Sequence, residues 1–402
     1  MYKREMYLRQ IRPFYSNEQI KILSGVRRSG KTELLKAIQA EIKVENPEAK
    51  IHYFSFELLE NRKYRDEAIL YAQIEKLLDD NCFHYLFLDE IQFVENWPEV
   101  VNSVKTKYKN VSIFLTGSNS KLLADDKESV LGGRTLLFRV MPFSFAEFHG
   151  YRKELNGGVE TDKGDDFNEY LNWGGFPLIF SEKEERRMVM LESIFDSIVL
   201  RDIVRRRGLR NSYQLEHIID FVISSTGSYI SGRNISERME KVKEKLSLPT
   251  VLDYLKAIEE SCIVDIVPRF DVIGLNTLEF NNKGYACDPA FVNYKKSLVS
   301  DLYGALYETI VYNDLIARGY QVKTGTARGK EIDFVASKGT VERIYVQVAY
   351  EVNDDNRQRE FGNFDAIDDN YPKYVVSKDK VLLSVKGIKH VNIVDFLLRE
   401  RV

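Results

Sequence analysis

The chain has 402 residues, which is enough for about two to four domains with sizeable hydrophobic cores. Hydrophobic residues make up 44% and charged residues 30%, a composition typical of a soluble globular protein. The net charge of −3 gives no case for a general attraction to nucleic acids, so any basic surface must be local. The three scattered cysteines, Cys82, Cys262 and Cys287, predict neither a disulfide framework nor a zinc site.

The sequence carries no signal for membrane insertion or export. No apolar stretch is long enough to span a bilayer. The first five residues, MYKRE, show no signal-peptide pattern. We therefore expect a cytoplasmic protein without a membrane partner.

Residues 25–32 fit the pattern G-x-x-x-x-G-K-[S/T] of the phosphate-binding loop, or P-loop, of nucleoside triphosphatases. The two glycines let the backbone bend so that consecutive N–H groups point at the β- and γ-phosphates. Lys31 is expected to reach the terminal phosphates, and the Thr32 hydroxyl is expected to bind Mg²⁺. The nucleotide-binding residues are expected to be Gly25, Val26, Arg27, Arg28, Ser29, Gly30, Lys31, Thr32 and Glu33.

A second motif lies at residues 85–92, where an apolar run ends in Asp89 and Glu90. Such a run predicts a buried strand that carries Asp89 to the sheet edge beside the P-loop, where it can hold Mg²⁺ through water. Glu90 is then placed to orient and deprotonate an attacking water molecule. A strand ending in a solvated acidic turn has the same pattern, so the interpretation depends on the P-loop that precedes it.

Polar residues also follow the strand expected at residues 111–115. A polar side chain at the tip of this strand can contact the γ-phosphate, and we expect Asn119 in this sensor role, with Ser118 as the second choice. The alternative is a polar turn that caps the next helix. Arg134 can stabilise transition-state charge, either in its own subunit or in a neighbour's, or else it is a surface ion-pairing residue.

Strands and helices alternate through this region, which predicts a parallel sheet with helices on both faces. The strands are expected at residues 19–23, 51–56, 85–88, 111–115 and 136–140. The helices between them are expected at residues 31–45, 66–78 and 97–108.

The set of motifs resembles the AAA+-type ATPases of archaea and bacteria that carry a DUF4143 C-terminal region. The matching segments are residues 25–32, 88–90, 116–120, 132–134, 142–148, 173–177, 201–204 and 331–334. This resemblance covers nearly the whole chain. It implies binding of ATP rather than GTP and hydrolysis of ATP, and it leaves the biological task undefined.

Residues 156–166 lack apolar periodicity and are expected to form an exposed loop. A long helix is expected at residues 183–206, and a basic cluster stands at its end. The cluster consists of Arg201, Arg205, Arg206, Arg207 and Arg210. It can meet the phosphates of DNA or of a neighbouring subunit's nucleotide, or it can complement the C-terminus of the helix.

Residues 211–293 predict three helices and then two strands, which is the order of a winged helix. Such a domain places its third helix in a DNA groove, with Tyr254 and Lys256 as candidate contacts. Acidic residues on the same helix, such as Glu259, repel phosphate. A contact with a protein partner is therefore the open alternative.

The order of elements after residue 296 resembles the PD-(D/E)XK nuclease fold. In active members, a helix glutamate, a strand aspartate and a Glu-x-Lys on the next strand gather Mg²⁺, and the lysine helps to activate water. Glu308 and Asp333 match the first two positions, but Gln347 and Ala349 stand at the last two. The resemblance implies a degenerate nuclease site, in which Lys330 or Lys386 would have to replace the missing lysine.

We therefore expect an α/β protein that begins with an AAA+-like P-loop domain at residues 1–150. A helical linker at 151–210, a winged helix at 211–295 and a small α/β PD-(D/E)XK nuclease-like domain at 296–402 are expected to follow.

The expected activity is hydrolysis of ATP to ADP and phosphate with Mg²⁺ as cofactor, by Lys31, Glu90, Asn119 and Arg134. A switch or motor that acts on double-stranded DNA is the first interpretation. The alternatives are a signalling or assembly ATPase with a protein partner, and an ATP-coupled, Mg²⁺-dependent DNA nuclease. A finger role of Arg134 in a neighbour would require a homo-oligomer.

Overall fold

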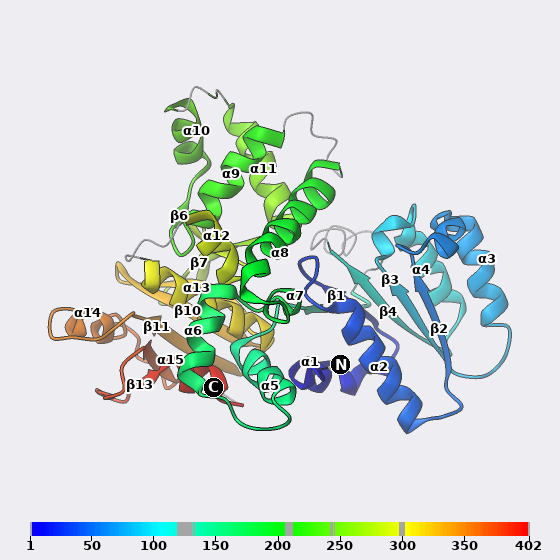
Figure 1. Ribbon diagram of the computed structural model, residues 1–402, viewed down its shortest axis with the longest axis horizontal. Helices are drawn as coiled ribbons and strands as arrows, with labels where there is room; N and C mark the ends of the chain where they lie inside the picture. The colour runs from blue at the N-terminus through cyan, green and yellow to red at the C-terminus, as the bar shows by residue number, and fades with distance from the viewer. Residues whose placement is uncertain are drawn as a thin grey trace. The chain divides into compact units, whose positions relative to one another are not determined.

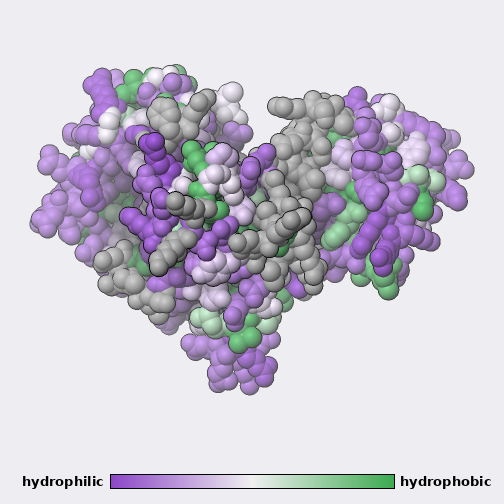
Figure 2. All heavy atoms as spheres, turned by 90° about the horizontal axis from the view of Figure 1, so that it is seen from above, coloured by the Kyte–Doolittle hydropathy of each residue, from purple (hydrophilic) through white to green (hydrophobic). Residues whose placement is uncertain are grey.

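The computed structural model of the chain describes residues 2–118, 131, 133–205, 212–241, 244, 246–296 and 302–400. The chain divides into two compact units, which are described separately below (Figure 1). Unit 1 comprises Met1–Val140 and Glu260–Cys262, and unit 2 comprises Met141–Glu259 and Ile263–Val402. Hydrophilic residues make up most of the coloured surface in Figure 2, with apolar residues in small scattered groups. None of the described helices is both long and apolar enough to cross a bilayer.

Unit 1 contains a parallel sheet of five strands in the spatial order β2-β3-β4-β1-β5. The strands are β1 (Ile20–Ser24), β2 (Lys50–Ser55), β3 (His84–Asp89), β4 (Val111–Gly117) and β5 (Thr135–Arg139). The predicted parallel α/β sheet is therefore confirmed. Since all strands run in one direction, the loops that follow β1, β3 and β4 meet at the same edge of the sheet.

The helices α3 (Glu67–Leu77) and α4 (Trp97–Lys107) of unit 1 begin at recognisable sequence signals. The other described helices before β5 are α1 (Glu5–Ile11) and α2 (Lys31–Glu45), with 3₁₀ turns η1 (Arg12–Phe14), η2 (Leu59–Arg65) and η3 (Ile91–Phe93). Asp66 caps α3 by accepting the N–H of Ile69 at 3.0 Å, and Pro98 stands in the first turn of α4. The three helices expected between the strands are confirmed to within one residue.

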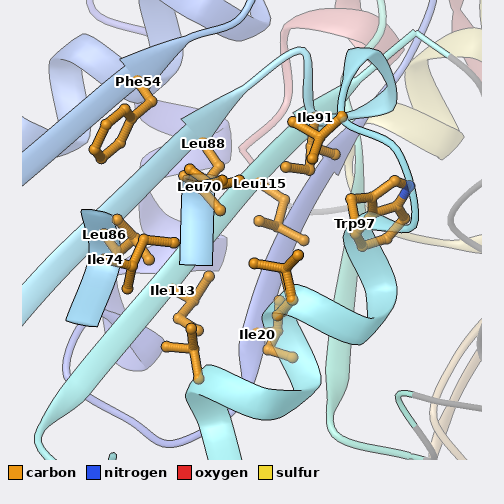
Figure 3. Packing of buried hydrophobic residues seen from close by; sticks show 14 of the residues in the cluster. Ile20, Phe54, Leu70, Ile74, Leu86, Leu88, Ile91, Trp97, Ile113 and Leu115 are labelled. Atoms are coloured by element: carbon orange, nitrogen blue, oxygen red, sulfur yellow. The ribbon is translucent and has the colours of Figure 1, made fainter. Parts of the chain in front are cut away.

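Both faces of the five-stranded sheet are covered. On one face, Leu88 and Leu115 belong to a buried cluster with residues of α3 and α4, including Trp97 (Figure 3). On the other face, the rings of Phe87 and Phe114 stack with their centroids 4.6 Å apart, and β4 contacts α2. Burial of strand residues on both faces explains why these strands read as continuous apolar runs rather than as alternating patterns.

Unit 2 begins with the helices α5 (Phe145–Leu155), α6 (Lys163–Trp173), α7 (Pro177–Phe180) and α8 (Glu184–Ser197), followed by the π-helical turn η5 (Ile198–Arg205). Ser144 and Glu147 form a capping box at the start of α5. The prediction of a loop over residues 156–166 is wrong at its end. There, Asp162 accepts the N–H groups of Gly164 at 2.8 Å and Asp165 at 3.0 Å, so α6 begins at Lys163.

The Trp-Gly-Gly-Phe-Pro segment at residues 173–177 is held by the buried Asp288. Its carboxylate accepts the N–H of Gly175 at 2.8 Å and that of Ala290 at 2.9 Å. A Cβ atom at Gly174 would lie 1.7 Å from Asp288 Oδ1, and Gly174 has φ of +71°, so only glycine fits here. Burial raises the pKa of Asp288 to about 7, although the two N–H groups oppose this shift.

The segment expected as a winged helix contains three helices and a hairpin, as predicted. Its elements are α9 (Ser212–Ser224), β6 (Tyr229–Ile230), α10 (Gly232–Lys241), α11 (Leu248–Glu260), β7 (Val264–Asp271) and β8 (Asn276–Ala286). The short strand β6 was not predicted, and it pairs antiparallel with β8. Two residues are too short to show a hydrophobic period, which is why the sequence did not reveal this strand.

The hairpin is part of a sheet of eight strands in the order β13-β12-β11-β10-β9-β7-β8-β6. The remaining elements are α12 (Pro289–Lys296), α13 (Tyr303–Ala317), β9 (Gln321–Ala327), β10 (Lys330–Lys338), β11 (Glu342–Val348), α14 (Arg357–Gly362), β12 (Lys373–Ser377), β13 (Lys389–Asn392) and α15 (Ile393–Leu398). Strand β7 pairs parallel with β9. The boundary expected at residue 295 therefore separates strands that share one sheet.

Candidate nucleotide-binding site

The loop between β1 and α2 has the geometry that its two glycines predict. A Cβ atom at Gly25 would lie 2.1 Å from the carbonyl oxygen of Val140, so the close approach of these backbones requires glycine. Gly30 has φ of +93°, a left-handed conformation that side chains rarely adopt, and it stands immediately before α2. The loop therefore turns sharply into the N-terminus of α2, where free N–H groups favour an anion.

Lys31 is the first residue of α2, and its side chain folds back over the loop. Its Nζ donates to the carbonyl oxygens of Gly25 at 2.9 Å and Val26 at 3.0 Å. No carboxylate is among these partners. The ammonium is therefore held at the loop by neutral acceptors, and neither of these two partners neutralises its charge.

Asp89 lies at the end of β3 and accepts hydrogen bonds from three hydroxyl groups. Thr32 donates at 3.0 and 3.1 Å, Thr116 at 2.6 Å and Tyr53 at 2.9 Å. Burial and the nearby charge of Asp89 raise the pKa of Tyr53, so this phenol stays protonated and remains a donor. The structure thus brings the two residues expected to bind Mg²⁺, Thr32 and Asp89, into direct contact.

Glu90 follows Asp89 in a left-handed conformation with φ of +56°, which is uncommon for a side-chain-bearing residue. Its N–H donates to Thr116 Oγ1 at 2.8 Å, and its carboxylate accepts a hydrogen bond from Gln92. Gln92 Nε2 also lies 3.4 Å from Ser118 Oγ at the end of β4. Ser118, the second choice for the sensor, is therefore joined to Glu90 through Gln92, whereas Asn119 lies outside the described residues.

The other expected nucleotide-binding residues have different surroundings. Val26 is buried, and Arg27 pairs with Glu57. Arg28 is exposed with φ of +69°. The hydroxyl of Ser29 is buried and has no hydrogen-bond partner among the described residues. Glu33 is exposed and forms an ion pair with Lys36 at 2.7 Å.

These features fit a nucleoside triphosphate with Mg²⁺. The backbone at Gly25 leaves no room for a Cβ atom, and among the described residues the buried Ser29 hydroxyl has no hydrogen-bond partner. The Lys31 ammonium and the hydrogen-bonded pair of Thr32 and Asp89 complete the set of polar groups. Alcohol and carboxylate oxygens are the ligand types that Mg²⁺ prefers. Thr32 and Asp89 would therefore hold the metal, as expected from the sequence.

Arg134 is not near this cluster within its own unit. It precedes β5, and its carbonyl oxygen accepts the N–H of Ile20 at the start of β1, whereas the P-loop follows the end of β1. Its side chain is exposed and lies 3.4 Å from Asn102 Oδ1. The prediction that Arg134 stabilises transition-state charge in its own subunit is wrong. The five residues of β1, about 16 Å in length, separate the end of the sheet at Arg134 from the end at the P-loop.

The candidate contacts with DNA are only partly described. The side chains of the basic cluster at residues 201–210 lie outside the described part of the chain. Of the two candidates on α11, Lys256 is exposed, whereas Tyr254 is buried and cannot serve as a surface contact. Tyr254 faces the interior because it shares the inner side of α11 with Val251 and Ile258.

A second cluster of charged residues lies in unit 2, at the expected degenerate nuclease site. Lys283 of β8 brings its Nζ within 3.5 Å of Glu308 Oε2 and 3.7 Å of Asp333 Oδ1, and within 2.5 Å of Glu331 Oε1. The structure therefore places Glu308 and Asp333, the two carboxylates named from the resemblance, around one lysine. It adds a lysine that sequence reasoning missed, because Lys283 stands in a segment assigned to the winged helix.

Burial and mutual repulsion perturb this second cluster. Burial raises the pKa of Glu308, and burial together with the charge of Glu308 raises the pKa of Asp333. Burial alone would lower the pKa of Lys283, but the charges of the surrounding carboxylates raise it. Asp333 Oδ2 also accepts the N–H of Val348 at 2.8 Å. Lys283 therefore remains an ammonium and serves as the counter-ion of these carboxylates.

Gln347 does not complete a metal site here. Phe334 pairs with Val346, so Asp333 and Gln347 follow as cross-strand neighbours on one face of the sheet. Gln347 Oε1 is buried and has no hydrogen-bond partner among the described residues. In the described part of the chain, no group of three or more His, Cys, Asp or Glu side chains is placed to hold a metal. With an ammonium between the carboxylates, these residues do not fit a nuclease-type Mg²⁺ site.

The two lysines considered as substitutes for the missing nuclease lysine point elsewhere. Lys330 Nζ donates to the carbonyl oxygen of Gly362 at 2.7 Å and lies 3.5 Å from Asp365. Lys386 is exposed, and its Nζ lies 3.9 Å from Asp365. Both belong to the region of α14 rather than to the cluster around Lys283.

Comparison with protein families separates the two parts of the chain. A family model described as an AAA domain matches residues 17–149. A second model, described as a domain of unknown function (DUF8612), matches residues 164–301. The family model found after the AAA domain is thus DUF8612 rather than the expected DUF4143. Its match extends across the domain boundaries expected near residues 210 and 295. The first unit of the chain is that of an AAA+-type P-loop ATPase.

An uncharacterized protein of Haemophilus influenzae is 32% identical over 402 residues, which is 99% of each chain. The chain belongs to the same protein family as this relative. An uncharacterized protein of Methanocaldococcus jannaschii is 28% identical over 360 residues and covers 85% of this chain and 77% of its own. Among solved structures, a Walker-type ATPase of Pyrococcus abyssi shares the fold, with a TM-score of 0.53, 15% identity, and coverage of 74% of this chain and 96% of that one.

Proposed function

We propose that the protein binds ATP with Mg²⁺ at the loop between β1 and α2 and hydrolyses it to ADP and phosphate. The proposal rests above all on the contact between Thr32 and Asp89 at the start of α2. These residues are 57 positions apart, and their meeting beside a glycine-bounded loop is the arrangement that a P-loop ATPase requires. The AAA domain match over residues 17–149 supports the same activity.

The residues around the loop have separate roles in nucleotide binding and in hydrolysis. The N–H groups at the start of α2 and the Lys31 ammonium bind the phosphates. Bound Mg²⁺ would neutralise phosphate charge, with Thr32 and Asp89 as its protein-side partners. Glu90 orients the attacking water and accepts its proton, and its left-handed backbone fixes the direction of its carboxylate. Ser118 reaches the same carboxylate through Gln92 and is the described candidate for a γ-phosphate sensor, with Asn119 as the other.

The role of the hydrolysis is proposed to be a switch or motor that acts on double-stranded DNA. The order α9-β6-α10-α11-β7-β8, with β6 paired to β8, supports a winged helix, and the exposed Lys256 supports a contact with phosphate. The acidic residues of α11 favour instead a protein partner, for a signalling or assembly ATPase. Arg134 acts on a neighbouring subunit only if the protein forms an oligomer.

Hydrolysis of ATP by the purified protein, with and without duplex DNA, tests this proposal. The matched variant is Glu90→Gln, which keeps the size and polarity of the side chain but cannot accept a proton. We expect wild-type turnover with Mg²⁺, and bound ATP without turnover in Glu90→Gln. Equal turnover in both proteins would contradict the role of Glu90.

The DNA arm of the experiment separates the two kinds of partner. Stimulation of turnover by duplex DNA, decreasing as salt rises, would support the DNA-directed switch, because phosphate contacts release counter-ions. Turnover that is indifferent to DNA at low salt would instead support a protein partner. Either result leaves the assignment of the ATP site intact.

A further inference from the structure

The N-terminal segment before β1 contacts the outside of the P-loop through Arg4. This arginine is 3% exposed, and its Nη1 donates to the carbonyl oxygen of Ser29 at 2.7 Å. The guanidinium lies 4.5 Å from the centre of the ring of Tyr7, which is also buried. Arg4 is 25 residues from Ser29 in sequence, so this contact is a product of the fold rather than of local chain geometry.

The contact fixes the orientation of one peptide of the loop. Because a trans peptide is planar, the N–H of Gly30 points in the direction opposite to the carbonyl oxygen of Ser29. A carbonyl held by Arg4 therefore leaves the Gly30 N–H directed away from Arg4. Gly30 has no side chain to stabilise its left-handed backbone, and Arg4 Nη1 lies 3.6 Å from where a Cβ atom would be. An external hydrogen bond is thus a direct means of holding this peptide in one orientation.

A second set of contacts anchors the segment that carries Arg4. Glu41 of α2 accepts hydrogen bonds from Arg12 at 2.9 and 3.0 Å and from Tyr15 at 2.8 Å, and it pairs with Lys3 at 2.8 Å. The hydrogen bonds from Arg12 hold the pKa of Glu41 well below its usual value, so it stays ionised. The segment from Lys3 to Tyr15 is therefore anchored by these contacts to α2, the helix that follows the P-loop.

We propose that Arg4 is a positioning residue for nucleotide binding, which braces the Ser29–Gly30 peptide so that the phosphate-binding N–H groups are pre-organised. Arg4 acts through the loop backbone, and the contacts of Glu41 on α2 hold the segment that carries Arg4. This role rests on the proposed ATP-binding function and extends it to a residue outside every motif of the sequence. Pre-organisation improves affinity by removing the ordering cost at the moment of binding.

The test is the Kd of a fluorescent ATP analogue with Mg²⁺, together with the thermal unfolding midpoint without nucleotide, for the full chain. Arg4→Ala is expected to weaken binding about tenfold, the effect of losing one charge-assisted hydrogen bond. Arg4→Lys keeps a charged donor but loses the planar guanidinium, and its Kd is expected to lie between those of Arg4→Ala and the wild type. Arg9→Ala is the matched control, because Arg9 is on α1, which Arg4 directly precedes, and its side chain is 60% exposed and 3.5 Å from Glu5. The Kd of this variant should stay within about twofold of the wild-type value.

The outcomes separate this proposal from the one on which it rests. Wild-type affinity in Arg4→Ala, with binding lost in Lys31→Ala, would refute the brace and leave the ATP site standing. Wild-type affinity in Lys31→Ala would refute the ATP site and the brace together. A lower unfolding midpoint with an unchanged Kd in Arg4→Ala would show a merely structural role and would also refute the brace.

A further variant keeps the test decisive if Arg4→Ala does not fold. Glu41→Gln removes the anchor of the segment without altering the P-loop or Arg4. We expect a smaller loss of affinity than the tenfold expected for Arg4→Ala, in the same direction. An unchanged Kd in Glu41→Gln would overturn the proposal that the anchored segment positions the loop.

Discussion

Each unit of this protein holds a buried lysine beside its candidate site, but the two lysines differ in what they contact. In unit 1, Lys31 donates to two backbone carbonyls, and Asp89 is held by three hydroxyl groups. In unit 2, Lys283 lies directly among Glu308, Glu331 and Asp333. A buried lysine therefore does not by itself make a ligand-binding site, because its role depends on the groups that surround the ammonium. Neutral partners leave the charge available to a ligand, whereas ion pairing uses the charge within the protein.

The largest effect is expected at the lysine with neutral partners. Lys31→Ala removes the ammonium from the phosphate-binding position, and we expect ATP turnover to fall at least about 100-fold, because such charge stabilisation acts in the transition state. Steady-state hydrolysis measures this. Lys36→Ala is the control, since Lys36 is on the same helix, half exposed and paired with Glu33. Turnover that survives in Lys31→Ala would show that hydrolysis does not depend on the Lys31 ammonium.

A loss of stability, rather than of activity, is expected at the lysine with charged partners. Lys283→Met leaves Glu308 and Asp333 without their counter-ion, and we expect about 3–5 kcal/mol less unfolding free energy for unit 2, with unchanged ATP affinity. Denaturant unfolding measures this. Lys378→Met is the control, because the pair of Lys378 with Glu351 is exposed, and it should cost less than about 1 kcal/mol. A stable Lys283→Met protein would show that the cluster is not held by Lys283.

A pH dependence is expected in unit 2 from Asp288. Its pKa in the folded state is about 7, against 3.8 in the unfolded chain, so between these values the folded protein holds a proton that the unfolded chain lacks. The unfolding free energy should therefore fall as the pH rises from 4 to 7, by at most about 1.4 kcal/mol per pH unit. Unfolding of the wild type and of Asp288→Asn across this range measures the effect. A slope that persists in Asp288→Asn would assign it to other groups.

The smallest effect is expected for metal binding at the cluster around Lys283. Because an ammonium lies among the carboxylates, we expect no Mn²⁺ to bind there, so Asp333→Asn should not change the Mn²⁺ stoichiometry of the nucleotide-free protein. Isothermal titration measures the stoichiometry, and incubation with duplex DNA and Mg²⁺ checks for cleavage. Loss of a Mn²⁺ site and of DNA cleavage in Asp333→Asn would support the nuclease alternative. It would also refute the interpretation that Lys283 serves only as the counter-ion of these carboxylates.

The sequence alone determined the five-stranded α/β unit and the main residues of its candidate site. Local rules were sufficient there, because the central strands β1, β3 and β4 are buried runs and the P-loop has a fixed spacing around Gly25 and Gly30. Asp89 and Glu90 stand at the end of such a run, so their place at the sheet edge follows from the direction of parallel strands. Helix bounds were also predictable where caps such as Asp66 were present.

The side chains that complete each cluster come from distant parts of the chain, and long-range folding brings them together. Tyr53 and Asp89 meet because β2 and β3 are neighbours. Lys283 of β8 reaches Asp333 of β10 because β8, β7, β9 and β10 are successive strands of one sheet. Arg4 reaches Ser29 through the folding of the N-terminal segment, which carries no motif. Such contacts depend on long-range pairing and packing, and the periodicity of a single segment contains no information about the partner that it will meet.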